Sequence, residues 1–233
     1  VYARNLVDLA IVNNCLIDEN ADATLEEILE QGSKVFKNWA KTSETPKFAF
    51  LETPAWPEAD IGAKNAIETA ITSLSSACQR ERLPDPFNKI IDYHAAVFAA
   101  ENSHYYGPFL DNHSELLSEK LRDRLIVSKT TLASEYIAAL NARDKIYHSL
   151  EALLDDYDAV LCLAATGAAP IGFETTGSAI FNGLWTYLGV PCLSLPLLTT
   201  ENMPLGLQLV GKRGNERKLF KTANWIENHL KAS

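Results

Sequence analysis

The chain has 233 residues and a formal net charge of −9, a length that supports one sizeable core, so we expect residues 1–233 to form a single domain. An acidic chain without a basic block does not suit phosphate backbones, which argues against a nucleic-acid partner. Its apolar runs are shorter than the roughly 18 residues of a membrane span and no stretch has a secretory-signal pattern, so we expect no membrane partner and a cytoplasmic location.

The cysteines and histidines give no metal-binding pattern. Cys15, Cys78, Cys162 and Cys192 are far apart and form no CxxC pair, so we expect reduced core thiols rather than disulfides or ligands. The five histidines show no HExxH spacing and have no tight carboxylate cluster beside them. We therefore expect neither a metal site nor a cofactor.

The first third of the chain alternates between helical and extended patterns. Residues 2–12 place apolar side chains on one helical face, and a short helix is expected around residues 25–29. Residues 47–52 alternate as a strand, and a proline-containing loop follows. From about residue 60 to residue 81, apolar residues keep the spacing of one amphipathic helix, which contains Ser75 and Ser76.

Helices dominate the middle of the chain. Asp85 followed by Pro86 is a good helix start, because the carboxylate can accept from free backbone N–H groups and the proline gives up a donor that has no partner. This helix carries His94 on its apolar face, and two further helices are expected over residues 115–128 and 131–154.

A buried strand follows at residues 157–163. The next connection, residues 164–178, is longer than most loops. We therefore regard this loop as a candidate wall of a pocket.

The last part of the chain predicts a helix, two strands and a helix. Apolar spacing over residues 179–188 is helical, and Gly189 can end that helix in a left-handed conformation. Strands are expected at residues 192–195, ended by Pro196, and at residues 205–210, with a helix beginning near residue 216. The connection between these two strands is too short for a parallel crossover, so they must pair antiparallel if they pair directly. The fold class is therefore α/β, with a mixed sheet and helices on its faces.

The segment FNGLWTYLGVPCLSLPLLTTENMPLGLQLVG, residues 181–211, resembles the C-terminal signature of the amidase signature family. YDAVLCL at residues 157–163 is similar to a strand of that family, and YARNLVDLAIV at residues 2–12 is similar to the helix that follows its catalytic segment. The connector after the first strand departs from the family, which usually places glycine there. The resemblance implies the C-terminal part of the amidase-signature fold and an enzyme that hydrolyses carbon–nitrogen (amide) bonds.

In that family a lysine acts through a bridging serine on a nucleophilic serine, and backbone amides of a glycine-rich segment stabilise the oxyanion. This sequence contains no such glycine- and serine-rich segment; its adjacent serines, Ser75 and Ser76, lie in a helical pattern without glycine. We therefore assign no catalytic residue here. Because the chain begins at Val1 and its one methionine is Met203, we expect the catalytic residues in a missing upstream part and no activity from this chain alone.

The resemblance places the helix before Gly189 near the acyl pocket, so Phe181, Asn182 and Ala179 are the predicted substrate-binding residues. Glutamine-using amidotransferase subunits carry an acidic residue about ten positions before this glycine, where this chain has Ala179, which disfavours glutamine as the substrate. For Trp185 on the same helix we expect core packing.

Two alternatives stay open at this stage. The chain could be a non-catalytic interaction or regulatory protein that pairs with an amidase N-terminal half, because half a sheet leaves edges that need cover. It could also be a self-sufficient hydrolase that uses His94 or His104, although a hydrogen-bonded core role is favoured for His94, and Ser178 has neither a GxSxG pattern nor a matched base. The expected partners are a small amide substrate and the missing N-terminal half, with a homodimer left open.

Overall fold

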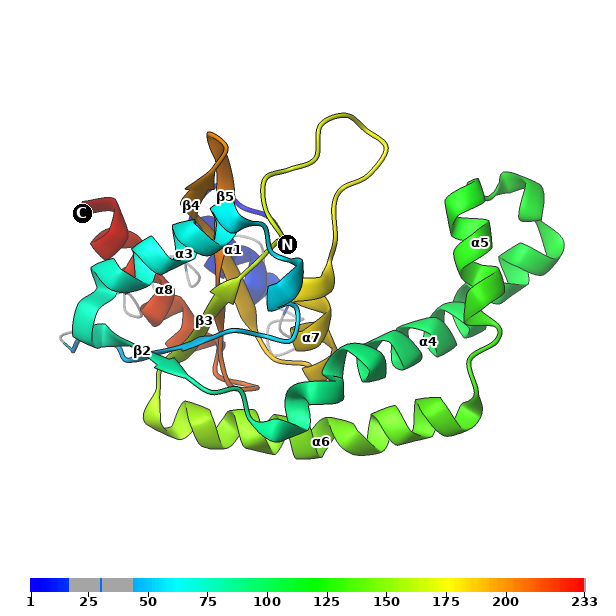
Figure 1. Cartoon of the computed structure of the whole chain (residues 1–233), viewed down its shortest axis with the longest axis horizontal. Helices are drawn as coiled ribbons and strands as arrows, with labels where there is room; N and C mark the ends of the chain where they lie inside the picture. Colours follow the sequence, from blue (N-terminus) through cyan, green and yellow to red (C-terminus); the bar gives the residue numbers. More distant parts are fainter. Residues whose placement is uncertain (17–29, 31–43, 233) are drawn as a thin grey trace.

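The computed structural model describes residues 1–16, 30 and 44–232, and these form a five-stranded sheet with helices on both faces (Figure 1). The strand order is β2-β1-β3-β5-β4. The strands are β1 Phe48–Leu51, β2 Cys78–Glu81, β3 Ala159–Leu163, β4 Cys192–Thr200 and β5 Met203–Val210. β1 pairs in parallel with β2 and β3, whereas β5 pairs antiparallel with β3 and β4. The expected mixed α/β sheet is confirmed.

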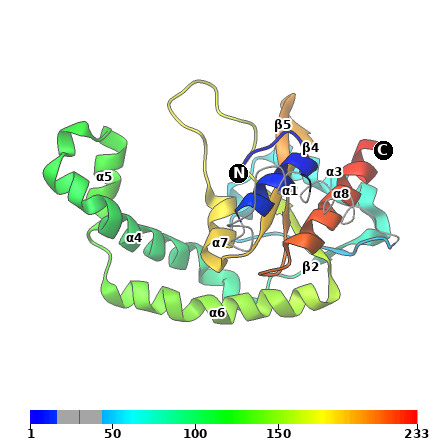
Figure 2. The same ribbon diagram turned by 180° about the vertical axis from the view of Figure 1, so that it is seen from behind.

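Two helical layers enclose the sheet (Figures 1 and 2). One layer consists of α1 Leu6–Cys15, α3 Ile61–Leu74 and α8 Glu216–Ala232; α8 packs against α1 and α3, and α3 and α8 pack on the strands. The other layer starts with α7 Ile180–Leu188, against which α4 Ile90–Asn112 and α6 Ala133–Asp156 pack. α5 Glu119–Ser128 packs on the far end of α4, so that α4 and α5 form an arm that extends away from the sheet (Figure 1).

Short 3-10 turns connect several of these elements. They are η2 Trp56–Glu58, η3 Ser75–Ala77, η4 Asp85–Lys89 and η5 Ser114–Leu116. The helices expected in the second half of the chain are confirmed by α5, α6 and α8, and Gly189 ends α7 with φ 61° as expected. The short helix expected around residues 25–29 lies outside the described residues.

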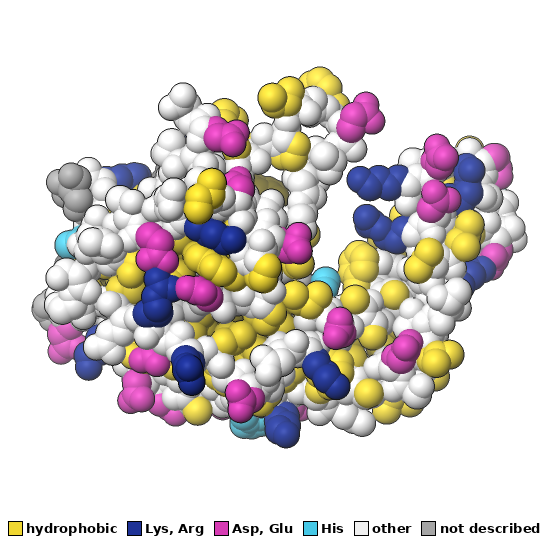
Figure 3. Space-filling model, viewed as in Figure 1, with side chains coloured by type: hydrophobic (Ala, Val, Ile, Leu, Met, Phe, Trp, Pro, Cys, Tyr) yellow, Lys and Arg dark blue, Asp and Glu magenta, His cyan; other side chains and the backbone are white. Residues whose placement is uncertain are grey.

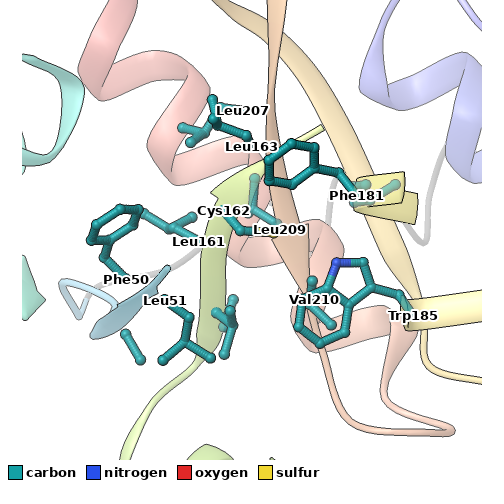
Figure 4. Close-up of a cluster of buried hydrophobic side chains, with 14 of the residues drawn as sticks. Phe50, Leu51, Leu161, Cys162, Leu163, Phe181, Trp185, Leu207, Leu209 and Val210 are labelled. Atoms are coloured by element: carbon teal, nitrogen blue, oxygen red, sulfur yellow. The ribbon is translucent and has the colours of Figure 1, made fainter. Parts of the chain in front are cut away.

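The central strands are buried on both faces. Every residue of β1 and β3 is buried, so the alternation expected for residues 47–52 is wrong. Strands covered by helices on both sides carry continuous apolar sequence instead. In Figure 4, Phe181 and Trp185 of α7 lie beside side chains of β3 and β5, and Phe50 and Leu51 of β1 lie on the other side of β3.

The single helix expected over residues 60–81 is also wrong. α3 ends at Leu74, and Ser75 takes φ 52°, which reverses the chain into η3 and then into β2. Ser75 and Ser76 therefore lie in a turn rather than inside a helix. In the sequence, Cys78 continues the apolar spacing of the helix, but in the structure it is a buried residue of strand β2.

The end of β4 differs from the expectation as well. Pro196 does not stop the strand, because the pairing register shifts between Leu195 and Leu198 and the irregularity accommodates the missing N–H. β4 continues to Thr200, and the hairpin turns through Glu201 and Asn202 with φ 51° and 58°. Two consecutive left-handed residues are the type I′ turn that suits the twist of a two-residue hairpin.

Candidate functional site

The candidate site lies at the start of α7, where this helix meets β3 and β5. Four apolar residues at helical spacing face the sheet and are buried: Phe181, Leu184, Trp185 and Leu188. The Trp185 ring, 1% exposed, lies 6.3 Å from the Phe87 ring, which confirms its expected core role. This packing fixes the helix, so that its first turn stands over the ends of the central strands.

The three predicted substrate-binding residues occupy different surroundings. Ala179 precedes α7 as its N-cap and is exposed, and Asn182 in the first turn is also exposed. The Phe181 ring is 0% exposed and belongs to the core (Figure 4). The structure thus brings Ala179 and Asn182 to the surface together and directs Phe181 inward. A role of these residues in substrate binding stays a prediction.

A chain of polar side chains joins Asn182 to the sheet. The Cys162 thiol donates to Gln208 Oε1 at 3.4 Å, Gln208 Nε2 donates to Asn182 Oδ1 at 2.8 Å, and Asn182 Nδ2 donates to the Ala164 carbonyl at 3.1 Å. We call Cys162, Gln208 and Asn182 the amide relay. Cys162 and Gln208 are direct cross-strand partners, and Gln208 is 4% exposed.

The groups at both ends of the amide relay determine which atoms donate and which accept along it. The Ala164 carbonyl can only accept, so the Asn182 atom that faces it must be the amide nitrogen, and Oδ1 therefore faces Gln208. At the other end, burial raises the pKa of the Cys162 thiol, which stays protonated and able to donate. The orientations of two side-chain amides are thereby determined.

Sequence reasoning missed Gln208. The available signal was a single amide side chain within the apolar run PLGLQLVG, residues 204–211. A buried polar side chain needs hydrogen-bond partners, so such a residue predicts a polar contact from whatever packs on that face. The partner Asn182 is 26 positions away and belongs to another element.

His94 packs against α7 at Gly183, the residue next to Asn182. A Cβ atom added to Gly183 would lie 2.6 Å from His94 Cε1 and 2.8 Å from Nδ1, so the imidazole rests directly on the helix backbone. The ring also lies 5.7 Å from the Phe98 ring. Burial lowers the pKa of His94, which favours the neutral imidazole. The expectation of a hydrogen-bonded core histidine is thus replaced by a half-buried ring held by packing.

The hydroxyl groups considered in the sequence have local structural roles. Ser178 Oγ accepts from the Ile180 N–H at 3.3 Å, and Thr175 Oγ1 accepts from the Gly177 N–H at 3.1 Å. His104 makes an edge contact with the neighbouring Tyr105 ring, at 4.9 Å. Nothing in this arrangement activates a serine.

The loop of residues 164–178 stands out beyond the sheet (Figure 1). Ile171 and Phe173 near its tip are fully exposed. Figure 3 shows a hollow between this loop and the arm formed by α4 and α5. The loop therefore borders an open space beside the start of α7, and its role as a pocket wall stays a prediction.

The described residues show neither a metal centre nor a membrane segment. No group of three or more His, Cys, Asp or Glu side chains lies close enough to hold an ion within these residues. In the same part of the chain, no helix has both the length and the apolar character needed to cross a bilayer.

Comparison with known proteins establishes the family. A model of the Amidase family matches residues 1–220, and the chain belongs to this family, the amidase signature hydrolases. The chain is 29% identical over 145 residues to the glutamyl-tRNA(Gln) amidotransferase A subunit of a Nitratiruptor species and 30% identical over 127 residues to that of Thermotoga maritima. These matches cover 58% and 48% of this chain but only 33% and 26% of the relatives. The matched part spans a third or less of their length.

Solved structures agree on the fold. A crystal structure of an amidase superposes with a TM-score of 0.72 at 22% identity, covering 81% of this chain and 46% of the amidase. The Thermotoga maritima glutamyl-tRNA(Gln) amidotransferase A subunit superposes with a TM-score of 0.57 at 25% identity, covering 78% and 42%. The fold of this chain therefore corresponds to somewhat less than half of each.

Proposed function

We propose that this chain is the C-terminal portion of an amidase that hydrolyses a carbon–nitrogen bond by a Ser-Ser-Lys mechanism, with the catalytic residues in an upstream part. The observation that carries the proposal is the family match over residues 1–220 combined with coverage of only 46% of the solved amidase and 42% of the solved amidotransferase subunit. The described residues offer no activated serine, which supports a division of roles. The upstream part would supply the chemistry, and this chain would supply sheet, helices and part of the substrate pocket.

The proposed pocket contribution is the start of α7. Ala179 and Asn182 are exposed side by side there, next to the long loop of residues 164–178. Ala179 carries no charge to hold the α-amino group of free glutamine, so a neutral amide fits this end of the helix better than glutamine does. The proposed substrate is thus an amide other than glutamine.

The proposed contact with the upstream part is the edge strand β4. Among the residues that the structure describes, β4 is the last strand of the sheet and pairs with β5 only. A groove of about 460 Å³ runs beside it, lined among others by Val1, Tyr2, Cys192, Ser194 and Phe220. An open strand edge is a template for further pairing. This supports the chain's dependence on additional polypeptide.

The test compares this chain with the product of the full reading frame that encodes it, using release of amine or ammonia from a panel of neutral amides. We expect turnover only from a polypeptide with an upstream glycine- and serine-rich segment. Turnover by the isolated chain that is lost on substituting one of its own serines would contradict the proposal. So would an upstream reading frame without such a segment, and in that case co-purification with a separate amidase N-terminal half would favour the interaction protein instead.

A further inference from the structure

We propose that Asn182 determines substrate specificity by presenting a single amide N–H to a hydrogen-bond acceptor of the substrate, such as a carbonyl oxygen, and that Gln208 holds it in this state. The inference rests on the proposed function, because it assigns a role within the same pocket. It concerns the chemistry that the start of α7 recognises.

The side-chain amide of Asn182 has two N–H donors and one carbonyl oxygen. The Ala164 carbonyl occupies one donor, and Gln208 Nε2 occupies one of the two lone pairs of the oxygen. The hydrogen bond at the nitrogen end is exposed, whereas the one at the oxygen end is partly buried against Gln208. The donor left for a ligand at the exposed nitrogen end is therefore the second N–H, while the oxygen end is turned toward Gln208.

The surroundings favour an acceptor over a cation. α7 begins at Ile180, and the positive end of its dipole attracts electron-rich atoms. Ala179 contributes no carboxylate, and the Ser178 hydroxyl caps the Ile180 N–H. A neutral acyl group with a carbonyl oxygen suits this environment, whereas an ammonium group finds no charged partner on this turn.

Gln208 makes this preference stable. An isolated asparagine can rotate its amide by half a turn and present oxygen instead of nitrogen. Here such a rotation would set Asn182 Oδ1 against the Ala164 carbonyl and Nδ2 against Gln208 Nε2, which replaces two hydrogen bonds with two repulsive contacts. Gln208 cannot rotate in compensation without losing the Cys162 thiol donor. Gln208 is thus a positioning residue for Asn182.

The experiment uses the protein as it is encoded, with any upstream part present, and follows the side-chain amide signal of Asn182 by NMR after isotope labelling of asparagine. Two matched probes are added, N-benzylacetamide as the neutral amide and benzylamine as the cation. We expect only N-benzylacetamide to shift the signal. Asn182→Asp, which has nearly the same shape, should weaken binding of the amide probe roughly tenfold, the equivalent of one hydrogen bond, and should admit benzylamine.

Two further variants separate positioning from folding. Gln208→Met keeps the length of the side chain without its hydrogen bonds and should weaken the amide probe while the overall fold persists in the remaining NMR signals. Asn228→Asp is the matched control: it makes the same change at an exposed asparagine of α8, in the other helical layer, whose Nδ2 also donates to a backbone carbonyl, and it should leave binding unchanged.

Several outcomes would overturn the inference. These are a shift of the Asn182 signal by benzylamine in the unmodified protein, no shift with either probe up to its solubility limit, or unchanged amide binding in Asn182→Asp. Unchanged binding in Gln208→Met would remove the positioning role of Gln208. Failure of the proposed hydrolase would look different, because amide binding at Asn182 would persist without turnover of any amide.

Discussion

Replacing Gly183 with alanine should reveal how closely α4 and α7 approach. Two opposed effects are expected. Alanine is favoured over glycine inside a helix by about 1 kcal/mol. The new methyl group, however, would lie 2.6 Å from His94 Cε1 and 3.1 Å from Nε2, well inside van der Waals contact.

The steric effect should be the larger one. The His94 ring is half-buried and lies beside Phe98, so it has little room to move, and inserting a methyl group into a packed contact typically costs about 1–3 kcal/mol. We expect Gly183→Ala to destabilise the chain by a net amount of about 1 kcal/mol. In a chain of this size, that lowers the melting temperature by roughly 2–4 °C.

The decisive measurement repeats the substitution in a His94→Ala background, using urea unfolding followed by circular dichroism. With the ring removed, the helical preference of alanine remains and the same change should stabilise by about 1 kcal/mol. The sign of the effect therefore reverses between the two backgrounds. A stabilising effect in both, or the same loss in both, would refute the close contact of His94 with the α7 backbone.

Individual residues elsewhere in the chain provide three more tests. Ser75→Gly should stabilise the chain by about 1 kcal/mol in urea unfolding, because Ser75 has φ 52° and glycine adopts that region without strain; a destabilised variant would contradict this. Cys15 is exposed and should react with a thiol reagent in the native state before Cys78 and Cys162, because burial raises the pKa of Cys78 to about 11 and that of Cys162 further. The substitution Cys15→Ser should remove the fast phase of the reaction. Persistence of that phase would show that another thiol is accessible. Burial raises the pKa of Tyr187 from 10.0 to about 12, so the contribution of its neutral hydroxyl to stability is complete below pH 10 and is lost as the pH rises through about 12. In a spectrophotometric titration, Tyr187→Phe should lack one late ionisation of the unmodified protein. Loss of an ionisation near pH 10 instead would contradict the burial effect.

The sequence was most informative where local rules decide the structure. The glycine after α7 and the paired apolar runs that follow it predicted the helix end and the antiparallel hairpin, because both depend on a few adjacent residues. β2 was missed because its first residue continued the apolar spacing of α3, and only the reversal at Ser75 separates the two elements. Pro196 was misjudged because the irregularity that accommodates it arises from pairing with β5.

The candidate site was predicted only in part. Family resemblance pointed to the first turn of α7, but resemblance alone could not distinguish the inward Phe181 from the exposed Asn182. The contribution of Gln208 depends on contacts between separate elements, which no local pattern contains. A lone polar residue in a buried strand is nevertheless a usable signal, because burial requires that it find partners.

The position of β3 has a consequence for synthesis. One side of this strand pairs with β1, which precedes it in the chain, whereas its other side pairs with β5, which is made later. Until the ribosome has released Val210, an entirely apolar strand therefore has one open side. A protein shortened before Met203 would keep that side permanently uncovered, and we expect it to aggregate in the cell rather than persist as a smaller folded unit.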